Sequence, residues 1–64
     1  MNRYRFAIGQ VVKITLEDRW VGEYDVQGTI ISLGNVFYNG VPTYNVRTSS
    51  KEVLTEVSEN KIVL

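Results

Sequence analysis

The chain has 64 residues, near the smallest size at which a polypeptide folds alone, so we expect a single domain over residues 1–64. It has no cysteine and no histidine, which argues against a disulfide framework, a bound metal or other cofactor, and catalysis by a histidine base. Seven acidic residues balance seven basic residues, so no broad positive field would attract nucleic acid or an anionic membrane surface.

The hydropathy pattern gives no sign of a membrane segment. No run approaches the roughly 18 apolar residues of a transmembrane helix, and the N-terminal residues MNRYRFAIG lack the apolar core of a signal peptide. We therefore expect a soluble, cytoplasmic protein.

The first predicted element is a strand over residues 10–16, QVVKITL. Val12, Ile14 and Leu16 fall on one face and the residues between them on the other, which is the period of two of a half-buried strand. Gly9 precedes the strand where the chain must turn sharply, a place that favours a residue without a Cβ.

Residues 17–25, EDRWVGEYD, are predicted to be a long loop. They hold the only tryptophan, Trp20, and a tyrosine, Tyr24, among four carboxylates and one arginine, so the formal charge of the segment is −3. Carboxylates beside aromatic rings suit a cationic peptide or a modified lysine. Alternatively, Trp20 or Tyr24 folds back as a lid on the core, where burying ~200 Å² of tryptophan would contribute on the order of 4–5 kcal/mol.

A second strand is predicted over residues 26–38, VQGTIISLGNVFY, which are rich in β-branched and aromatic residues. The alternation of apolar and polar residues breaks at Ile30 and Ile31 and again at Gly34 and Asn35. Such breaks are typical of a bulge or a strong bend in a long strand.

A hairpin turn is predicted at Asn39 and Gly40, because a type I′ turn needs positive φ at both central residues. This turn would place Tyr38 opposite Val41. Pro42 cannot donate a backbone hydrogen bond, so it suits an edge position beside the turn.

The tip of this hairpin, residues 36–42, is a second candidate contact surface. Three consecutive bulky apolar residues precede the turn, so at least one, such as Phe37 or Tyr38, must point outward. Together with Val41 and Pro42 it would form an apolar patch, and such patches often mark partner surfaces, including those of homo-oligomers.

A third strand is predicted over residues 43–48, TYNVRT, with Tyr44, Val46 and Thr48 on one side. Residues 49–51 then form a turn.

A fourth strand is predicted over residues 52–57, EVLTEV. Val53, Thr55 and Val57 should share one face and Leu54 the other.

The chain ends with the polar residues 58–61, enough for one helical turn, and a short strand over 62–64. The elements together predict an all-β fold, a small and strongly bent five-stranded barrel with a single 3-10 turn before the last strand. Its predicted core consists of Val12, Ile14, Ile30, Tyr44, Val46, Leu54, Val57 and Ile62.

Several short motifs resemble the skeleton of Src-homology-3-like (SH3-like) barrels, a group that includes Tudor and KOW modules and many small bacterial and phage proteins. They are residues 9–12 (GQVV), 28–30 (GTI), 44–46 (YNV) and 57–59 (VSE), with Ile62. The resemblance implies an SH3-like barrel from Phe6 onward and, by analogy, a phage or mobile-element origin. In peptide-binding members, the loop placed like residues 17–25 offers carboxylates to a basic ligand. The family's aromatic motifs for proline-rich ligands are absent here, so that ligand class does not carry over.

The first functional hypothesis is therefore a non-catalytic binding or adaptor module. Its partner would be another protein or a second copy of the chain. The predicted contact residues are Asp18, Trp20, Glu23, Tyr24, Phe37 and Tyr38.

The alternative hypothesis is a nucleic-acid-binding barrel of the KOW or Tudor kind. Its predicted contact residues are Arg3, Arg5, Lys13 and Arg47. Tyr4 and Phe6 lie between the first cations and would supply rings for base stacking. The zero net charge counts against this alternative.

An enzyme is also conceivable, because plasmid-encoded type II dihydrofolate reductases are small barrels of this kind. Their chemistry depends on a Val-Gln-Ile-Tyr stretch, and the nearest stretch here, residues 53–56 (VLTE), lacks the glutamine and the tyrosine. No nucleophile and base can be paired from the sequence, so we expect no catalysis.

Overall fold

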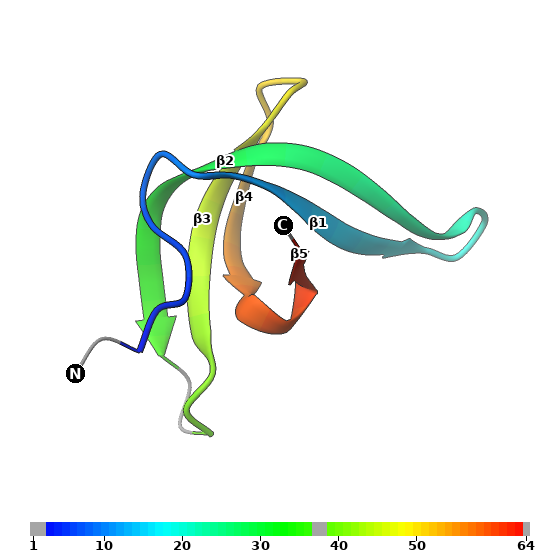
Figure 1. The fold of residues 1–64 in the computed structure, drawn as a ribbon. Helices are drawn as coiled ribbons and strands as arrows, with labels where there is room; N and C mark the ends of the chain where they lie inside the picture. The colour runs from blue at the N-terminus through cyan, green and yellow to red at the C-terminus, as the bar shows by residue number, and fades with distance from the viewer. Residues whose placement is uncertain (1–2, 37–38, 64) are drawn as a thin grey trace.

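The computed structural model describes residues 3–36 and 39–63 (Figure 1). These residues form five antiparallel strands of one sheet, ordered β4-β3-β2-β1-β5, and one short 3-10 helix, η1. The elements are β1 (Val11–Asp18), β2 (Gly22–Val36), β3 (Pro42–Thr48), β4 (Val53–Ser58), η1 (Glu59–Lys61) and β5 (Ile62–Val63). The prediction of an all-β chain with a 3-10 turn before the last strand is confirmed. The predictions for Phe37 and Tyr38, including the pairing of Tyr38 with Val41, lie outside the described residues.

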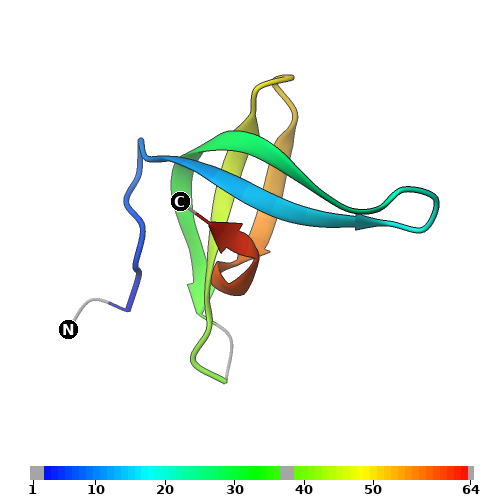
Figure 2. The same cartoon turned by 45° about the vertical axis from the view of Figure 1, so that its right-hand side comes forward.

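The sheet owes its curvature to β2, which is 15 residues long and pairs with β1 along its first part and with β3 along its second. The β2–β3 register shifts between Ile30 and Ser32 and again between Leu33 and Val36, so the two predicted breaks in alternation are confirmed as irregularities of this strand. β4 and β5 are the two edges of the sheet in the described part of the chain, and η1 joins them (Figure 2). The described strands thus form an open, bent sheet, and the predicted closure of the sheet into a barrel is not observed among the described residues.

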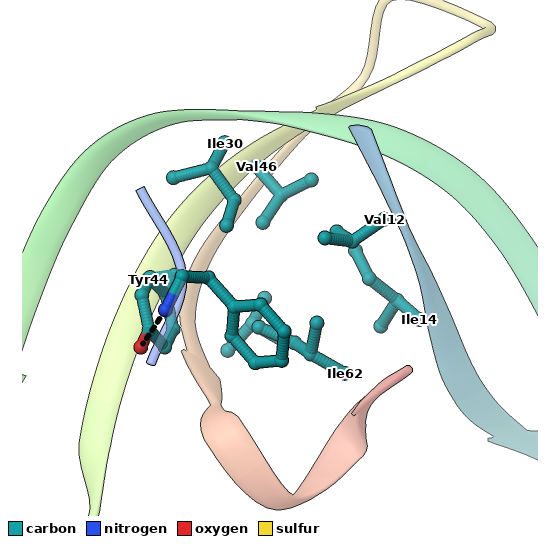
Figure 3. Packing of buried hydrophobic residues seen from close by; sticks show 8 residues of the cluster. Val12, Ile14, Ile30, Tyr44, Val46 and Ile62 are labelled. Atoms are coloured by element: carbon teal, nitrogen blue, oxygen red, sulfur yellow. Dashed lines mark hydrogen bonds between the residues drawn. The ribbon is translucent and has the colours of Figure 1, made fainter. Parts of the chain in front are cut away.

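The concave inner face of the sheet carries the core (Figure 3). The predicted core is confirmed except for Leu54, which is half-buried and packs against the cluster. Phe6, which the sequence analysis omitted, is only 6% exposed and belongs to the core. The buried apolar residues are Phe6, Val12, Ile14, Ile30, Tyr44, Val46, Val57 and Ile62.

The predicted faces of the fourth strand are wrong. Val53 and Thr55 are exposed, whereas Leu54 and Val57 face the core. The β3–β4 register shifts between Tyr44/Val57 and Val46/Leu54, so β4 contains an extra residue. Glu56 adopts a φ of 52°, and its backbone N–H donates to the Asn45 side chain at 3.1 Å. This bulge reverses the alternation between Leu54 and Val57.

Tyr44 fastens the N-terminal segment to the inner face. Its hydroxyl accepts hydrogen bonds from the backbone N–H groups of Arg5 (3.0 Å) and Phe6 (3.2 Å) and donates one to Oε2 of Glu59 (2.7 Å). The same carboxylate accepts from the Arg5 N–H at 3.1 Å. The rings of Tyr4 and Phe6 meet the Tyr44 ring edge to face, with centroids 5.6 and 5.7 Å away. We call these five residues the Tyr44 clamp.

Burial raises the pKa of Tyr44 above its ordinary value of 10.0, and the hydrogen bond to Glu59 raises it further. The phenol is therefore held in its neutral form, as a donor to the carboxylate.

Within the described residues, no helix is long and apolar enough to cross a membrane.

Candidate functional site

Residues 17–25 do not form the predicted loop. β1 and β2 remain paired as far as Asp18 and Gly22, so only residues 19–21 turn. β5 pairs with β1 only at Lys13 and Ile14, and the pairing of β3 with β2 begins at Gly28. Residues 15–25 are therefore a two-stranded hairpin without a third strand in the described sheet, and they project from its body in both views (Figures 1 and 2). We call this hairpin the arm.

The turn at the end of the arm is built by Asp18. Its Oδ1 accepts hydrogen bonds from the backbone N–H groups of Trp20 (2.7 Å) and Val21 (3.2 Å). Gly22 follows with a φ of 88°, a conformation that side chains rarely adopt. Of the predicted contact residues, Asp18 thus has a structural role: it shapes the tip that presents Trp20.

Trp20 is 87% exposed and Val21 is 73% exposed, so both project into solvent at the tip. The interpretation of Trp20 as a lid on the core is wrong for the single chain. Tyr24 is 40% exposed and lies on the inner side of the arm, opposite Leu16, which packs against the core. Trp20 and Tyr24 therefore lie on one projecting element, Trp20 at its tip and Tyr24 on its inner side.

The outer side of the arm is acidic. Thr15 lies opposite Asp25 and donates a hydrogen bond to it at 3.0 Å, and Glu17 lies directly opposite Glu23. Like charges at opposed positions destabilise a strand pair. Four carboxylates and one arginine give the whole arm a formal charge of −3. The opposed glutamates and the net negative charge therefore do not stabilise the arm itself.

The second predicted surface, the hairpin tip at 36–42, is only partly described. Pro42 is buried at the start of β3 and Val41 is half-buried, so the expected exposed patch that includes Pro42 is wrong. The Asn39 side chain accepts from the Val41 N–H at 3.1 Å, and Gly40 has the positive φ expected of this turn.

The four cations of the nucleic-acid hypothesis are not brought to one surface. Arg3 and Arg5 belong to the N-terminal segment, which the Tyr44 clamp holds on the inner side. Lys13 and Arg47 are exposed on the outer side of β1 and β3, with β2 between them. The two rings expected to stack on bases, Tyr4 and Phe6, pack on Tyr44 instead.

A further surface, which the sequence did not predict, lies on the outer side of the sheet. Val11, Thr29, Arg47 and Val53 form a row across four strands, and Val11 and Val53 are 54% and 46% exposed. Part of this row lines a shallow hollow of about 440 Å³, the outer-face hollow. Its lining residues are Val11, Gln27, Gly28, Thr29, Ile31, Arg47, Thr48 and Ser49. The signal was present in the sequence, because residues 11 and 31 place apolar side chains on the face opposite the core.

Comparison of the chain with models of protein families, with curated proteins and with solved structures found no match. In the part of the chain that the structure describes, no group of three or more acidic residues is arranged to share a metal ion.

Proposed function

We propose that the chain is a non-catalytic protein-binding module that uses the arm as its contact element. The observation that carries the proposal is the exposure of Trp20, 87%, at the tip of a projecting hairpin. Covering a tryptophan of ~200 Å² would contribute on the order of 4 kcal/mol to binding. Tryptophan is also among the residues most enriched at the energetic centres of protein interfaces.

The chemistry of the arm indicates the kind of partner. Trp20 and Val21 need an apolar recess, and Tyr24 adds an amphipathic ring behind them. Glu17 and Glu23 oppose each other and would both be relieved by a cation between them. The best partner is therefore an apolar surface edged by lysine or arginine. The same charge of −3 would repel nucleic acid.

We further infer that the bent sheet belongs to the SH3-like barrels. This is supported by the strand order β4-β3-β2-β1-β5, by the long β2 shared between β1 and β3, and by η1 before the last strand. The arm then occupies the place of the acidic loop with which peptide-binding members meet basic ligands.

The test uses Trp20 as its own reporter, because it is the only tryptophan in the chain. Titration with a panel of peptides that combine lysine or arginine with apolar residues should shift its fluorescence to the blue for those that bind. Trp20→Ala should abolish binding, followed by calorimetry, while leaving the melting temperature within a few degrees. The matched control is Ile8→Ala, which removes another exposed apolar side chain, 61% exposed, in the segment that precedes β1.

Two results would overturn the proposal. One is a Trp20→Ala variant that binds the same peptides as well as the native chain. The other is salt-dependent binding of single- or double-stranded nucleic acid that is lost on Lys13→Glu or Arg47→Glu, which would support the alternative hypothesis.

A further inference from the structure

The outer side of the β1–β2 ribbon changes character along its length. Near the sheet it is apolar and basic, with Val11 and Lys13 on β1 and Arg47 on the neighbouring β3. On the arm it is acidic, with Asp25, Glu17 and Glu23. The arm carries −3, whereas Lys13 and Arg47 are exposed cations near the sheet on the same outer side. The molecule therefore has two exposed regions of opposite charge.

The same two regions also match in apolar character. The tip presents Trp20 and Val21 with most of their surface in solvent. The outer-face hollow has a volume of about 440 Å³ and includes Val11 and Ile31, which are 54% and 36% exposed. Arg47 lines this hollow, and a guanidinium favours the face of a tryptophan ring. The hollow therefore combines exposed apolar side chains with a cation, as expected of a binding surface for Trp20 and Val21.

The spacing of residues along β1 allows complementary surfaces of two copies to face each other. Thr15 lies four residues from Val11 and four from Arg19, at about 3.4 Å per residue in an antiparallel strand. If two ribbons pack outer side to outer side about a two-fold axis near Thr15, the tip of each copy lies as far from that axis along the strand as Val11 in the hollow of the other copy. In that register, Glu17 of each chain faces Lys13 of the second copy. Two-fold pairing of this kind is the commonest symmetry of soluble oligomers.

We propose that the partner of the arm is a second copy of this chain, in a reciprocal dimer in which the tip of each chain occupies the outer-face hollow of the other. The inference rests on the proposed function of the arm as a contact element and adds the identity of its partner. The opposed Glu17 and Glu23 become favourable in this arrangement, because Lys13 of the second copy approaches them.

The experiment is sedimentation equilibrium of the full chain over a wide range of concentration, with Trp20 fluorescence recorded on the same samples. We expect a reversible change from one chain mass to twice that mass, accompanied by a blue shift. Trp20→Ala and Arg47→Glu should each raise the dissociation constant at least about tenfold. Leu33→Ala, a 41% exposed position on the second part of β2, outside both the arm and the hollow, should leave the dissociation constant unchanged.

A charge exchange tests the register. Lys13→Glu and Glu17→Lys should each weaken the dimer, and the double variant should restore most of the affinity, because both contacts between the copies are then complementary again. Within one chain the two residues lie on one side of β1 but about 14 Å apart, too far for direct pairing. Restoration in the double variant therefore reports a contact between copies.

Three results would overturn the inference. They are a chain that stays monomeric at millimolar concentration, a dimer that withstands Trp20→Ala, and a mass that grows beyond two chains. A monomeric chain that still binds cationic peptides through Trp20 would overturn the dimer and leave the proposed function standing. Loss of neither activity on Trp20→Ala would overturn both.

Discussion

The Tyr44 clamp and the arm are built from the same kinds of side chain and use them in opposite ways. In the clamp, the Tyr44 hydroxyl, the Glu59 carboxylate and two backbone N–H groups satisfy one another, and Tyr4 and Phe6 cover the ring. In the arm, Trp20 and Tyr24 remain exposed and two glutamates oppose each other. An aromatic ring near a carboxylate is therefore no indication of a binding site by itself. The useful distinction is whether the chain already satisfies and covers those groups.

The largest expected effect comes from removing the ring at the centre of the clamp. Tyr44 is fully buried, so Tyr44→Ala should cost about 3–5 kcal/mol from the cavity and the lost contacts. The total stability of a chain of this length is only ~3–10 kcal/mol. We therefore expect little or no cooperative thermal unfolding by circular dichroism. By contrast, Trp20→Ala should change the unfolding free energy by less than about 0.5 kcal/mol. Equal destabilisation by the two variants would erase the distinction between clamp and arm.

Gly28 tests how tightly the body of the sheet is packed. A Cβ at this position would lie 2.6 Å from Cγ1 of Val46 and 3.0 Å from the carbonyl oxygen of Arg47. The backbone oxygen cannot move aside cheaply, so Gly28→Ala should cost about 1–3 kcal/mol. Urea denaturation should show a lower midpoint with an unchanged slope. A variant as stable as the native chain would mean that the strands around the core can separate more easily than the contacts indicate.

The hydroxyl of Tyr44 should make stability sensitive to alkaline pH. Because its pKa is raised on folding, the folded state favours the neutral phenol, and this contribution is fully present below the ordinary pKa of 10.0. It is lost as the pH rises through the higher pKa of the folded state. Denaturation measured from about pH 8 to pH 12 should show this loss. Tyr44→Phe should lower stability by about 1–3 kcal/mol at neutral pH and remove that part of the alkaline dependence. An unchanged alkaline profile in Tyr44→Phe would contradict the assignment.

The sequence correctly predicts those strands in which apolar and polar residues alternate regularly. Residues 43–48 are the clearest case, because Tyr44 and Val46 alternate with polar residues without interruption. Residue propensities predict a loop for the arm because its aspartates and glutamates have low β-propensity, although Tyr24 and Val26 alternate regularly with them. These residues form a strand because they pair with β1, and residue propensities contain no information about that pairing.

Other features depend on contacts that no local pattern contains. The buried Phe6 ring packs on the Tyr44 ring, and the Phe6 N–H donates to the Tyr44 hydroxyl, 38 residues further along the chain. The bulge in β4 places a positive φ at Glu56, a residue type that gives no signal for it. The outer-face hollow requires the register of three strands at once. The exposure of Trp20 likewise depends on the turn that Asp18 builds, which the order of the residues alone does not specify.

The smallest effects should have opposite signs in the two regions. Glu59→Gln weakens a charge-assisted pair of hydrogen bonds in the clamp and should cost about 1–2 kcal/mol. Glu17→Gln removes a repulsion across the arm and should stabilise the dilute chain by about 0.2–0.5 kcal/mol. Chemical denaturation at low and high salt would measure both, and the gain from Glu17→Gln should shrink with salt because the repulsion is screened. If neutralising Glu17 stabilises the single chain but weakens its association with a second copy, this carboxylate is retained for recognition, at a small cost in folding stability. If Glu17→Gln destabilised the chain as Glu59→Gln does, the arm would be a structural element like the clamp.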